Sequence, residues 1–455
     1  MRKIEQRLRL CTVLLLLFIL GMCYFLFLYK RDSGKWYVQS FNKHLYSDSG
    51  ELLSGTIVDR NGVLLSTVNG NTRVYSYNPV VRKATLHVIG DSERKIGTGA
   101  VQTMREYMLS YDRLSGANSL SEQGNTVMLS VDSEACAAAY NAMGDAVGCV
   151  GVYNYKTGEI LCLLSTPTFD PKNIPEDLET SDKYDGVYVN RFLSSTFAPG
   201  STFKTVTLQA ALETLPDLEN RTFVCEGTLR LGDNKINCTK THGAQTLAEA
   251  YANSCNCVFA SLAAELGGDI LSDYTSQAGL TSSYRFSGCS TAKGTFELVS
   301  ASTNQLGWAG VGLYHDLVNP CSLMVYMGAV ANGGAAAVPT LLRSVTKADG
   351  TSVAVPDVQT TGALIQHATA SKLSSYMIYN VQNVYGAERF PNVRIGAKSG
   401  TIEQKTGLSN CWFAGFVDSE QYPYAFVVFM EQAGSGNRVA GAVAAAVLHS
   451  LIPLP

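Results

Sequence analysis

The strongest constraint on the fold is an uncharged stretch close to the N-terminus. Residues 10–29, LCTVLLLLFILGMCYFLFLY, are 20 mostly apolar residues, which is the length that a helix needs to cross a bilayer. The basic residues that precede it favour a cytoplasmic N-terminus: Arg2, Lys3, Arg7 and Arg9. A cleaved signal peptide is the alternative, but the stretch ends in YFLFLYK and has no Ala-x-Ala site. We therefore expect a cytoplasmic tail at residues 1–9 and an uncleaved single-pass anchor at residues 10–29, with the rest of the chain outside the cytoplasm.

The composition of the chain excludes several kinds of partner. Its 455 residues are 46% hydrophobic and carry a net charge of −3, which indicates a sizeable core and no nucleic-acid partner. The sequence has no Cys-x-x-Cys, His-x-x-x-His or His-Glu-x-x-His pattern, and no Gly-rich phosphate loop. We therefore predict no metal site and no cofactor.

Cysteine use leaves the redox state open. Cys225 and Cys238 flank the short loop CEGTLRLGDNKINC, so they could form a disulfide in an oxidising compartment. The alternative is that most of the 12 cysteines are small buried hydrophobic residues.

Turn and strand signals divide the part after the anchor into two regions. Residues 30–145 are predicted to form a small non-catalytic α/β module, in which residues 55–66 form a hairpin around Asn61-Gly62. Residues 146–455 are predicted to form a large domain that opens with a strand, a turn and a strand at 147–167. Its other expected elements are helices at 201–214, 247–267 and 439–452, and strands at 393–403, 410–418 and 424–431.

The stretch APGSTFKTVT at residues 198–207 contains the first candidate for chemistry. The pattern Ser-x-x-Lys occurs five times, starting at Ser40, Ser92, Ser201, Ser290 and Ser344. Only Ser201 follows a Pro-Gly breaker and opens a long apolar helix. A hydroxyl there lies near unsatisfied backbone N–H groups, and the i+3 spacing puts Lys204 on the same face, where it can act as the base if burial lowers its pKa. The alternative is a serine that caps the helix and a lysine that reaches water.

The second candidate is Ser254-Cys255-Asn256, one of several Ser-x-Asn matches in the chain. We expect it in the middle of an Ala-rich helix, where polar side chains need partners. Ser254 could relay a proton to a leaving amine, and Asn256 could bind a substrate amide through its donor and acceptor. The alternative is a buried polar pair that satisfies backbone groups.

The third candidate is Lys398-Ser399-Gly400-Thr401. The pattern Lys-(Ser/Thr)-Gly starts at Lys156, Lys398 and Lys405, and only the copy at Lys398 lies inside a predicted strand. There a cation and two hydroxyls would line a strand edge, and Gly400 would let a ligand come close to the backbone. Such donors suit a carboxylate.

The order of these three motifs resembles the signature of penicillin-binding proteins and serine β-lactamases. The segments FAPGSTFK, SCNCVFA, AKSGT, CWFAGF and GEILCLLSTPTFDP are similar to segments of penicillin-binding proteins, and GTIVDRNGVLLS is similar to the start of the non-catalytic module of their class B. Over nearly its whole length the chain thus resembles a short class B, monofunctional enzyme. The resemblance implies an α+β fold with a transmembrane helix, a linker or dimerisation-type module at 30–145, and a transpeptidase domain at 146–455. That domain would have an antiparallel five-stranded sheet flanked by helices, and an all-helical subdomain.

The resemblance also implies a role for each motif in bacterial peptidoglycan cross-linking. Ser201 would be acylated by a stem peptide ending in D-Ala-D-Ala, with Lys204 as the base, and Ser254 would pass a proton to the departing D-Ala. Both Lys204 and Lys398 would face the hydroxyl of Ser201. The substrate would be bound by the remaining motif residues, Asn256 on its peptide side and Lys398, Ser399, Gly400 and Thr401 at its terminal carboxylate. The backbone N–H groups of Ser201 and Thr401 would form the oxyanion hole.

Partners and location follow from the same resemblance. An amine from a neighbouring stem peptide would displace the acyl group and form a cross-link, whereas β-lactams would acylate Ser201 and stay attached. The protein would be held in the bacterial cytoplasmic membrane by its N-terminal helix. It would depend on a polytopic membrane glycan polymerase, because the region before the large domain is too short to hold a glycosyltransferase domain.

Three alternatives share the motifs. A D,D-carboxypeptidase would hand the acyl group to water, and a serine β-lactamase would hydrolyse β-lactams, although such enzymes are usually shorter and unanchored. A catalytically silent scaffold of a division or elongation complex is the non-enzymatic alternative. It is disfavoured because Ser201 and Lys204 are both present.

Overall fold

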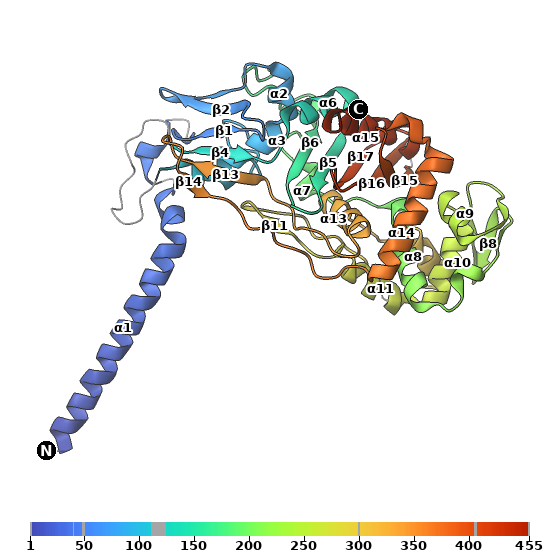
Figure 1. Ribbon diagram of the computed structural model, residues 1–455, viewed down its shortest axis with the longest axis horizontal. Coiled ribbons are helices and arrows are strands. Elements are labelled where there is room, and N and C mark those ends of the chain that lie inside the picture. Colours follow the sequence, from blue (N-terminus) through green and yellow to red (C-terminus); the bar gives the residue numbers. More distant parts are fainter. Residues whose placement is uncertain are drawn as a thin grey trace.

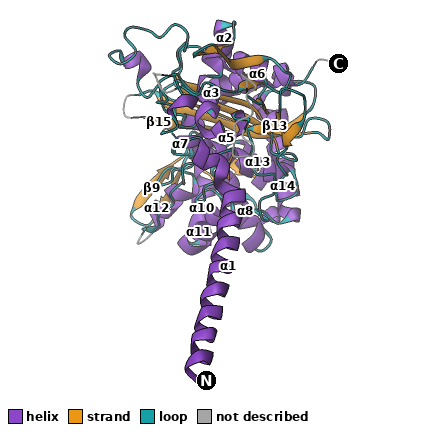
Figure 2. Cartoon of the chain, turned by 90° about the vertical axis from the view of Figure 1, so that its left-hand side faces the viewer, coloured by secondary structure: helices purple, strands orange, loops and turns teal. Residues whose placement is uncertain are grey.

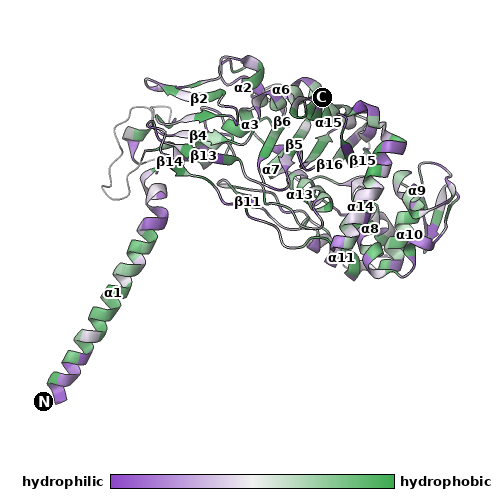
Figure 3. Ribbon diagram, in the orientation of Figure 1, coloured by the Kyte–Doolittle hydropathy of each residue, from purple (hydrophilic) through white to green (hydrophobic). Residues whose placement is uncertain are grey.

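The N-terminal helix stands away from the body of the protein. The computed structural model describes residues 2–39, 41–47, 51–110, 124–298, 301–404 and 407–453. Helix α1 (Arg2–Tyr37) is 36 residues long and extends from one end of the molecule (Figures 1 and 2). Its middle is apolar along its length (Figure 3), none of its most apolar window is buried, and it is long and apolar enough to cross a membrane. The helix continues on both sides of residues 10–29, so the basic residues of the predicted tail belong to the same helix.

A six-stranded sheet lies next to α1. Its strand order is β14-β13-β4-β1-β2-β3, and β1 pairs with β2 as the predicted hairpin around Asn61-Gly62, which is thus confirmed. The strands are β1 (Thr56–Val58), β2 (Leu64–Asn69), β3 (Thr72–Tyr75), β4 (Thr126–Leu129), β13 (Leu342–Thr346) and β14 (Ser352–Ala354). Strands β13 and β14 come from the predicted large domain, so this sheet crosses the predicted boundary at residue 145, which stays a prediction.

Short helices complete this part of the chain, and a buried ion pair joins it to the large domain. The helices are η1 (Lys43–Leu45), α2 (Pro79–Ala84), α3 (Leu86–Ile89), α4 (Ala100–Thr103) and α5 (Arg105–Met108). Arg82 of α2 donates two hydrogen bonds to Asp170, Nε to Oδ1 at 2.7 Å and Nη2 to Oδ2 at 2.6 Å. The two side chains are only 5% and 8% exposed, so this pair fixes α2 against the loop that follows β6.

The large domain is built on a five-stranded antiparallel sheet. The strand order is β15-β16-β17-β5-β6. The strands are β5 (Gly148–Asn154), β6 (Ile160–Thr166), β15 (Arg394–Glu403), β16 (Ser409–Asp418) and β17 (Tyr424–Met430). Pairing of β17 with β5 joins the two ends of the domain. The strands are buried on both faces, which explains why they read as nearly continuous apolar runs.

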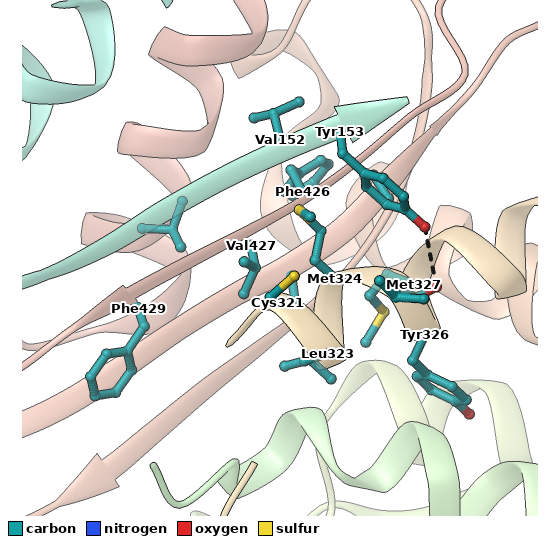
Figure 4. Packing of buried hydrophobic residues seen from close by; sticks show 14 of the residues in the cluster. Val152, Tyr153, Cys321, Leu323, Met324, Tyr326, Met327, Phe426, Val427 and Phe429 are labelled. Carbon is teal, nitrogen blue, oxygen red and sulfur yellow. Dashed lines mark hydrogen bonds between the residues drawn. The ribbon is translucent and has the colours of Figure 1, made fainter. Parts of the chain in front are cut away.

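Helices cover both faces of this sheet. Helices α6 (Ser133–Met143) and α15 (Gly441–Leu451) pack together on one face, and α13 (Pro320–Ala331) packs on the other (Figure 1). In the core between α13 and the sheet, Cys321, Met324 and Met327 lie against Val427 and its neighbours on β17 (Figure 4). The buried hydroxyl of Tyr153 donates to the carbonyl of Val325, so its polar atom is satisfied within the core (Figure 4).

A mainly helical subdomain carries the first two motifs. Its helices are α8 (Lys204–Thr214), α9 (Leu247–Ala252), α10 (Asn256–Leu266), α11 (Gly268–Gln277) and α12 (Thr303–Gly310), and α14 (His367–Asn380) packs between α8 and β15. The subdomain predicted to be all-helical also holds two small sheets, β7 (Phe223–Cys225) with β10 (Gly243–Gln245) and β8 (Thr228–Leu231) with β9 (Asn234–Asn237). The remaining elements are short: η2 (Asp182–Tyr184), α7 (Arg191–Ser194), η3 (Gly200–Thr202), η4 (Leu218–Asn220), β11 (Arg285–Phe286), β12 (Cys289–Ser290), η5 (Val381–Tyr385), η6 (Ala387–Arg389) and η7 (Gly436–Ala440). The predicted α+β fold is confirmed.

Candidate active site

Ser201 lies in the turn that leads into the central helix of the subdomain. It belongs to η3, a single 3₁₀ turn that runs directly into α8. Every residue from Lys204 to Ala211 of α8 is buried, so this helix is enclosed by protein on all sides. Ser201 itself is half-buried and thus keeps one side accessible.

Two glycines allow the Ser201 turn to pack directly on strand β15. Gly200 has a φ of +52°, and a Cβ at this position would lie 2.7 Å from Cγ1 of Ile402. A Cβ at Gly400 would lie 3.1 Å from the carbonyl oxygen of Pro199. The indole N–H of Trp412 on β16 donates to the carbonyl of Ala198 at 2.8 Å and ties the same turn to the sheet. The first and third motifs are therefore in contact through their glycines.

The amine of Lys204 is the centre of the site. Its Nζ lies 3.0 Å from Oγ of Ser201, 2.6 Å from the carbonyl oxygen of Ser254, 3.1 Å from Oγ of Ser254 and 2.7 Å from Oδ1 of Asn256. The carbonyl and the amide oxygen can only accept hydrogen bonds. A neutral amine that donates its two hydrogens to these oxygens keeps its lone pair for a hydroxyl proton. The geometry therefore suits Lys204 as the base for Ser201.

The second motif lies in a break between two helices, so the prediction of one helix over 247–267 is wrong. A capping box of Thr246 and Glu249 starts α9, which ends at Ala252, and α10 begins at Asn256. Between them Ser254 adopts a left-handed conformation with a φ of +53°, which is costly for a residue with a side chain. This break frees the carbonyl of Ser254 from helical hydrogen bonding and lets it accept from Lys204.

The third motif approaches from β15, and its lysine reaches Ser254. Lys398 Nζ donates to Oγ of Ser254 at 3.0 Å and to the carbonyl of Ser399 at 2.9 Å. Among the described residues, hydrogen bonds link the amine of Lys398 to Ser201 by way of Ser254 and Lys204. The sequence predicted instead that both amines face Ser201. The hydroxyl and the backbone N–H of Ser399 both donate to the hydroxyl of Tyr385 at 3.1 Å. Thr401 is exposed on the same strand.

Burial sets the electrostatics of the two lysines. Both side chains are completely buried, and loss of hydration disfavours the charged form of an amine. Burial lowers the pKa of Lys204 to about 7. Burial also lowers the pKa of Lys398 far below its ordinary value, and the nearby Lys204 lowers it further. The site is therefore built to hold a lysine in its neutral form near neutral pH.

The structure thus brings the three predicted motifs into one site. Ser201, Lys204, Ser254, Asn256 and Lys398 are linked by hydrogen bonds, with the Ser399–Thr401 stretch beside them. The roles of these residues stay predictions. Two pattern matches that the sequence set aside, at Ser40 and Lys405, lie outside the described residues. In the described part of the chain Cys225 and Cys238 are not bonded to each other. The disulfide between them also stays a prediction.

Three residues of the site had no signal in the sequence. Tyr385 of η5 holds Ser399, and the carbonyl of Asn237 accepts from Nδ2 of Asn256 at 3.0 Å, which turns Oδ1 of Asn256 towards Lys204. The backbone N–H of Gly436 donates to Oγ1 of Thr401 at 3.1 Å. All three come from segments outside the motifs, so only the fold reveals them.

Comparison with known proteins agrees with this geometry. Residues 148–451 match the penicillin binding protein transpeptidase domain family. The peptidoglycan D,D-transpeptidase PbpA of Mycobacterium tuberculosis is 26% identical in an alignment of 356 positions that covers 72% of each chain. The D,D-transpeptidase domain of a peptidoglycan glycosyltransferase from Eggerthella lenta superimposes with a TM-score of 0.76 at 26% identity, covering 88% of this chain and 97% of that one.

A second solved structure shows the same fold at lower identity. PBPA of Mycobacterium tuberculosis superimposes with a TM-score of 0.76 at 23% identity, covering 88% of this chain and all of that one. The family that the motifs resembled is thus confirmed by the match over most of the large domain and by relatives whose match covers 72% of both chains. The chain belongs to the penicillin-binding protein transpeptidase family and is one of its class B members.

Proposed function

We propose that this protein is a membrane-anchored peptidoglycan D,D-transpeptidase that acts through an acyl-enzyme on Ser201. The observation that carries the proposal is the environment of Lys204. Its buried amine lies 3.0 Å from Oγ of Ser201, and two oxygens that can only accept occupy its hydrogens. A serine with such a neighbour is an activated nucleophile. The names of relatives that match most of the chain support the same activity.

Acylation begins when Ser201 attacks the carbonyl carbon between the two D-Ala residues of a stem peptide. The hydroxyl proton of Ser201 moves to Nζ of Lys204 as the Oγ–C bond forms. The backbone N–H groups of Ser201 and Thr401 bind the oxyanion, and a donor of this kind typically contributes ~2.7–4 kcal/mol. The C–N bond then breaks, and the proton passes from Lys204 through Oγ of Ser254 to the departing amine of D-Ala.

The second half of the reaction reverses these steps with a different amine. The amine of a neighbouring stem peptide attacks the ester, a new C–N bond forms and the C–Oγ bond breaks. The amine gives up its proton, which returns to Oγ of Ser201 by way of Lys204. During acylation Lys398, Ser399 and Thr401 hold the terminal carboxylate, which leaves with D-Ala, and Asn256 holds the peptide side of the donor in both halves of the reaction.

The location of the protein follows from α1. The basic residues at its start favour a cytoplasmic N-terminus, which puts the large domain of the proposed enzyme on the outer side of the membrane, where peptidoglycan lies. The glycan strands come from a polytopic membrane polymerase that acts as its partner. β-Lactams acylate Ser201 and remain attached.

Labelling with fluorescent penicillin tests the proposal. The wild type is expected to give one stable adduct, and Ser201→Ala none. Ser290→Ala is the matched control, because Ser290 begins another Ser-x-x-Lys pattern but is exposed on β12, so its labelling should equal that of the wild type. Labelling of Ser201→Ala would overturn the assignment of the nucleophile.

A second measurement shows whether the acyl group on Ser201 is transferred to an amine or to water. The wild type is incubated with a D-Ala-D-Ala stem peptide and an acceptor amine, and the products are separated by mass. Cross-linked product is expected from the wild type and not from Ser201→Ala. Only hydrolysed donor would mean a carboxypeptidase, and rapid turnover of the penicillin would mean a β-lactamase.

A further inference from the structure

Four side chains with metal-binding atoms meet beside the second motif. The thiols of Cys225, Cys238 and Cys255 and the imidazole of His242 place one ligand atom each within 4.8 Å of all the others. They come from the end of β7, from the loop between β9 and β10, and from the break between α9 and α10. We propose that these four residues bind a structural Zn²⁺ ion.

The distances within the cluster fit a tetrahedral zinc site. With Zn–S bonds of ~2.3 Å and a Zn–N bond of ~2.0–2.1 Å, tetrahedral angles separate two sulfurs by about 3.8 Å and a sulfur and a nitrogen by about 3.6 Å. Sγ of Cys238 lies 3.8 Å from Sγ of Cys255 and 3.5 Å from Nδ1 of His242. At 3.8 Å, Sγ of Cys238 and Sγ of Cys255 are too far apart for the ~2.05 Å bond of a disulfide.

The kinds of ligand indicate zinc and a structural role. Three thiolates and an imidazole are soft ligands that select Zn²⁺ over Mg²⁺ or Ca²⁺. Four protein ligands fill the tetrahedral shell and leave no open position for a substrate. The backbone N–H of Asn256 donates to Sγ of Cys238 at 3.3 Å. A hydrogen bond of this kind orients a sulfur that binds a metal. Cys238 and His242 are half-buried and give the ion a way in.

The segment between α8 and α9, which supplies three of the four ligands, has little regular structure of its own. Between α8 and α9 the chain forms the short helix η4 and two sheets of two short strands each, at the end of the molecule beside α9 and α10 (Figure 1). Most residues of β8 and β9 are exposed or half-buried, and isolated two-stranded sheets are marginally stable in water. A metal ion would add a direct link between this segment and the start of α10, beside the contacts that β7, β8 and β9 already make with that helix.

The site would also position two groups of the second motif. Cys255 lies between Ser254 and Asn256, and Cys238 follows Asn237, whose carbonyl orients the amide of Asn256. Metal binding at Cys238 and Cys255 therefore holds both partners of that hydrogen bond, as well as the left-handed turn at Ser254. Cys238, Cys255 and His242 act as positioning residues, because none of them is hydrogen-bonded to Ser201 or to the amine of Lys204.

Metal content provides the direct test. The full-length protein is purified in detergent with a reductant, and its metals are measured by mass spectrometry. One zinc per chain is expected. His242→Ala and Cys255→Ala each remove a ligand, so each should lower the zinc affinity by more than about 100-fold, which is the upper end of the effect of removing a residue that only hydrogen-bonds a ligand. Cys289→Ala is the matched control, because Cys289 is a buried cysteine outside the cluster, and it should keep its zinc.

A zinc chelator applied to the wild type supplies a readout that needs no variant. Chelation should lower the melting temperature and slow acylation by fluorescent penicillin, and Zn²⁺ but not Mg²⁺ should restore both. Wild-type protein in which all three thiols are reduced but which holds no zinc after exposure to Zn²⁺ would overturn the proposal. So would a Cys225–Cys238 disulfide in protein purified with reductant, because it consumes two ligands. Zinc content does not depend on acyl transfer, so a zinc-loaded protein that fails to react with penicillin would contradict the proposed function and not the metal site.

Discussion

Oγ of Ser254 lies 3.0 Å from Nζ of Lys398. The same oxygen lies 3.1 Å from Nζ of Lys204, so one hydroxyl bridges two completely buried amines. Two ammonium groups at this separation would repel each other in a medium that hydrates neither. The arrangement therefore favours at most one charged lysine at a time, and in the proposed mechanism Ser254 is placed to pass the proton from Lys204 to the leaving amine.

The acylation rate should depend on pH through Lys204. Because burial lowers the pKa of Lys204 to about 7, the amine is neutral and active above this value and protonated and inactive below it. The second-order rate constant for fluorescent penicillin should rise with pH and level off above pH 7, and fall by about tenfold per unit well below it. A rate that still climbs steeply towards the ordinary lysine pKa of 10.5 would show that Lys204 is not perturbed in this way.

Replacing Asn256 by Asp should move this pH profile. Oδ1 of Asn256 lies 2.7 Å from Nζ of Lys204, so Asn256→Asp places a carboxylate against the amine. An opposite charge at this distance favours the charged form, which should raise the midpoint of the profile by about 1–3 units. Asn234→Asp adds the same charge on exposed strand β9 and should leave the midpoint where it is. Equal midpoints in all three proteins would contradict the role of Asn256.

Gly200 should tolerate no side chain. Gly200→Ala combines an unfavourable positive φ with a Cβ only 2.7 Å from Cγ1 of Ile402, so the Ser201 turn must move away from β15 and acylation should slow by at least about tenfold, the effect of roughly 1.4 kcal/mol. Gly232→Ala is the control, since its φ is +60° but nothing lies near its Cβ. It should lose about 1–2 kcal/mol of stability from backbone strain alone and acylate normally. Ile402→Ala removes Cγ1 and Cδ1, so in the Gly200→Ala background it should recover part of the rate.

The Arg82–Asp170 pair should be a major contributor to stability. Asp170→Asn leaves the guanidinium of Arg82 buried without a countercharge, which typically costs about 3–5 kcal/mol in the free energy of unfolding. Urea denaturation measures this difference. Lys156–Glu420 is the control pair, because Glu420 is 93% exposed, and Glu420→Gln should change stability by less than about 0.5 kcal/mol.

The same pair predicts a loss of stability in acid. Burial alone would raise the pKa of Asp170, but hydrogen bonds from Arg82, Lys172 and Asn173 outweigh it and lower this pKa to about 2. The native state therefore binds a proton less readily than the unfolded chain does, and the contribution of Asp170 to stability is present above the ordinary pKa of 3.8 and is lost as the pH falls towards 2. Asp170→Asn should flatten the stability profile in this range.

The parts of the site that depend on local spacing could be predicted from the sequence. Ser201 and Lys204 share a face because they are three residues apart at the start of a helix, and the breaker before them marks that start. The break at Ser254 could not be predicted in this way, because the surrounding alanines favour a continuous helix. A tertiary hydrogen bond from Lys204 to the carbonyl of Ser254 helps to hold this serine at positive φ, and the local sequence does not reveal such a contact.

Contacts between segments that are far apart in the sequence could not be predicted either. The cluster of Cys225, Cys238, His242 and Cys255 has no compact spacing in the sequence, because its ligands come from three separate segments. Strands β13 and β14 are short and partly polar, and nothing in them indicates that they join a sheet formed by residues that precede the large domain.

That shared sheet imposes an order on folding. Strand β4 is synthesised early, but its neighbour β13 follows only after more than two hundred further residues, most of the catalytic domain among them. Until then β4 has one open edge that can pair with another chain. A nascent or truncated chain that stops before residue 342 is therefore expected to aggregate, because the edge of β4 stays unpaired until β13 is present.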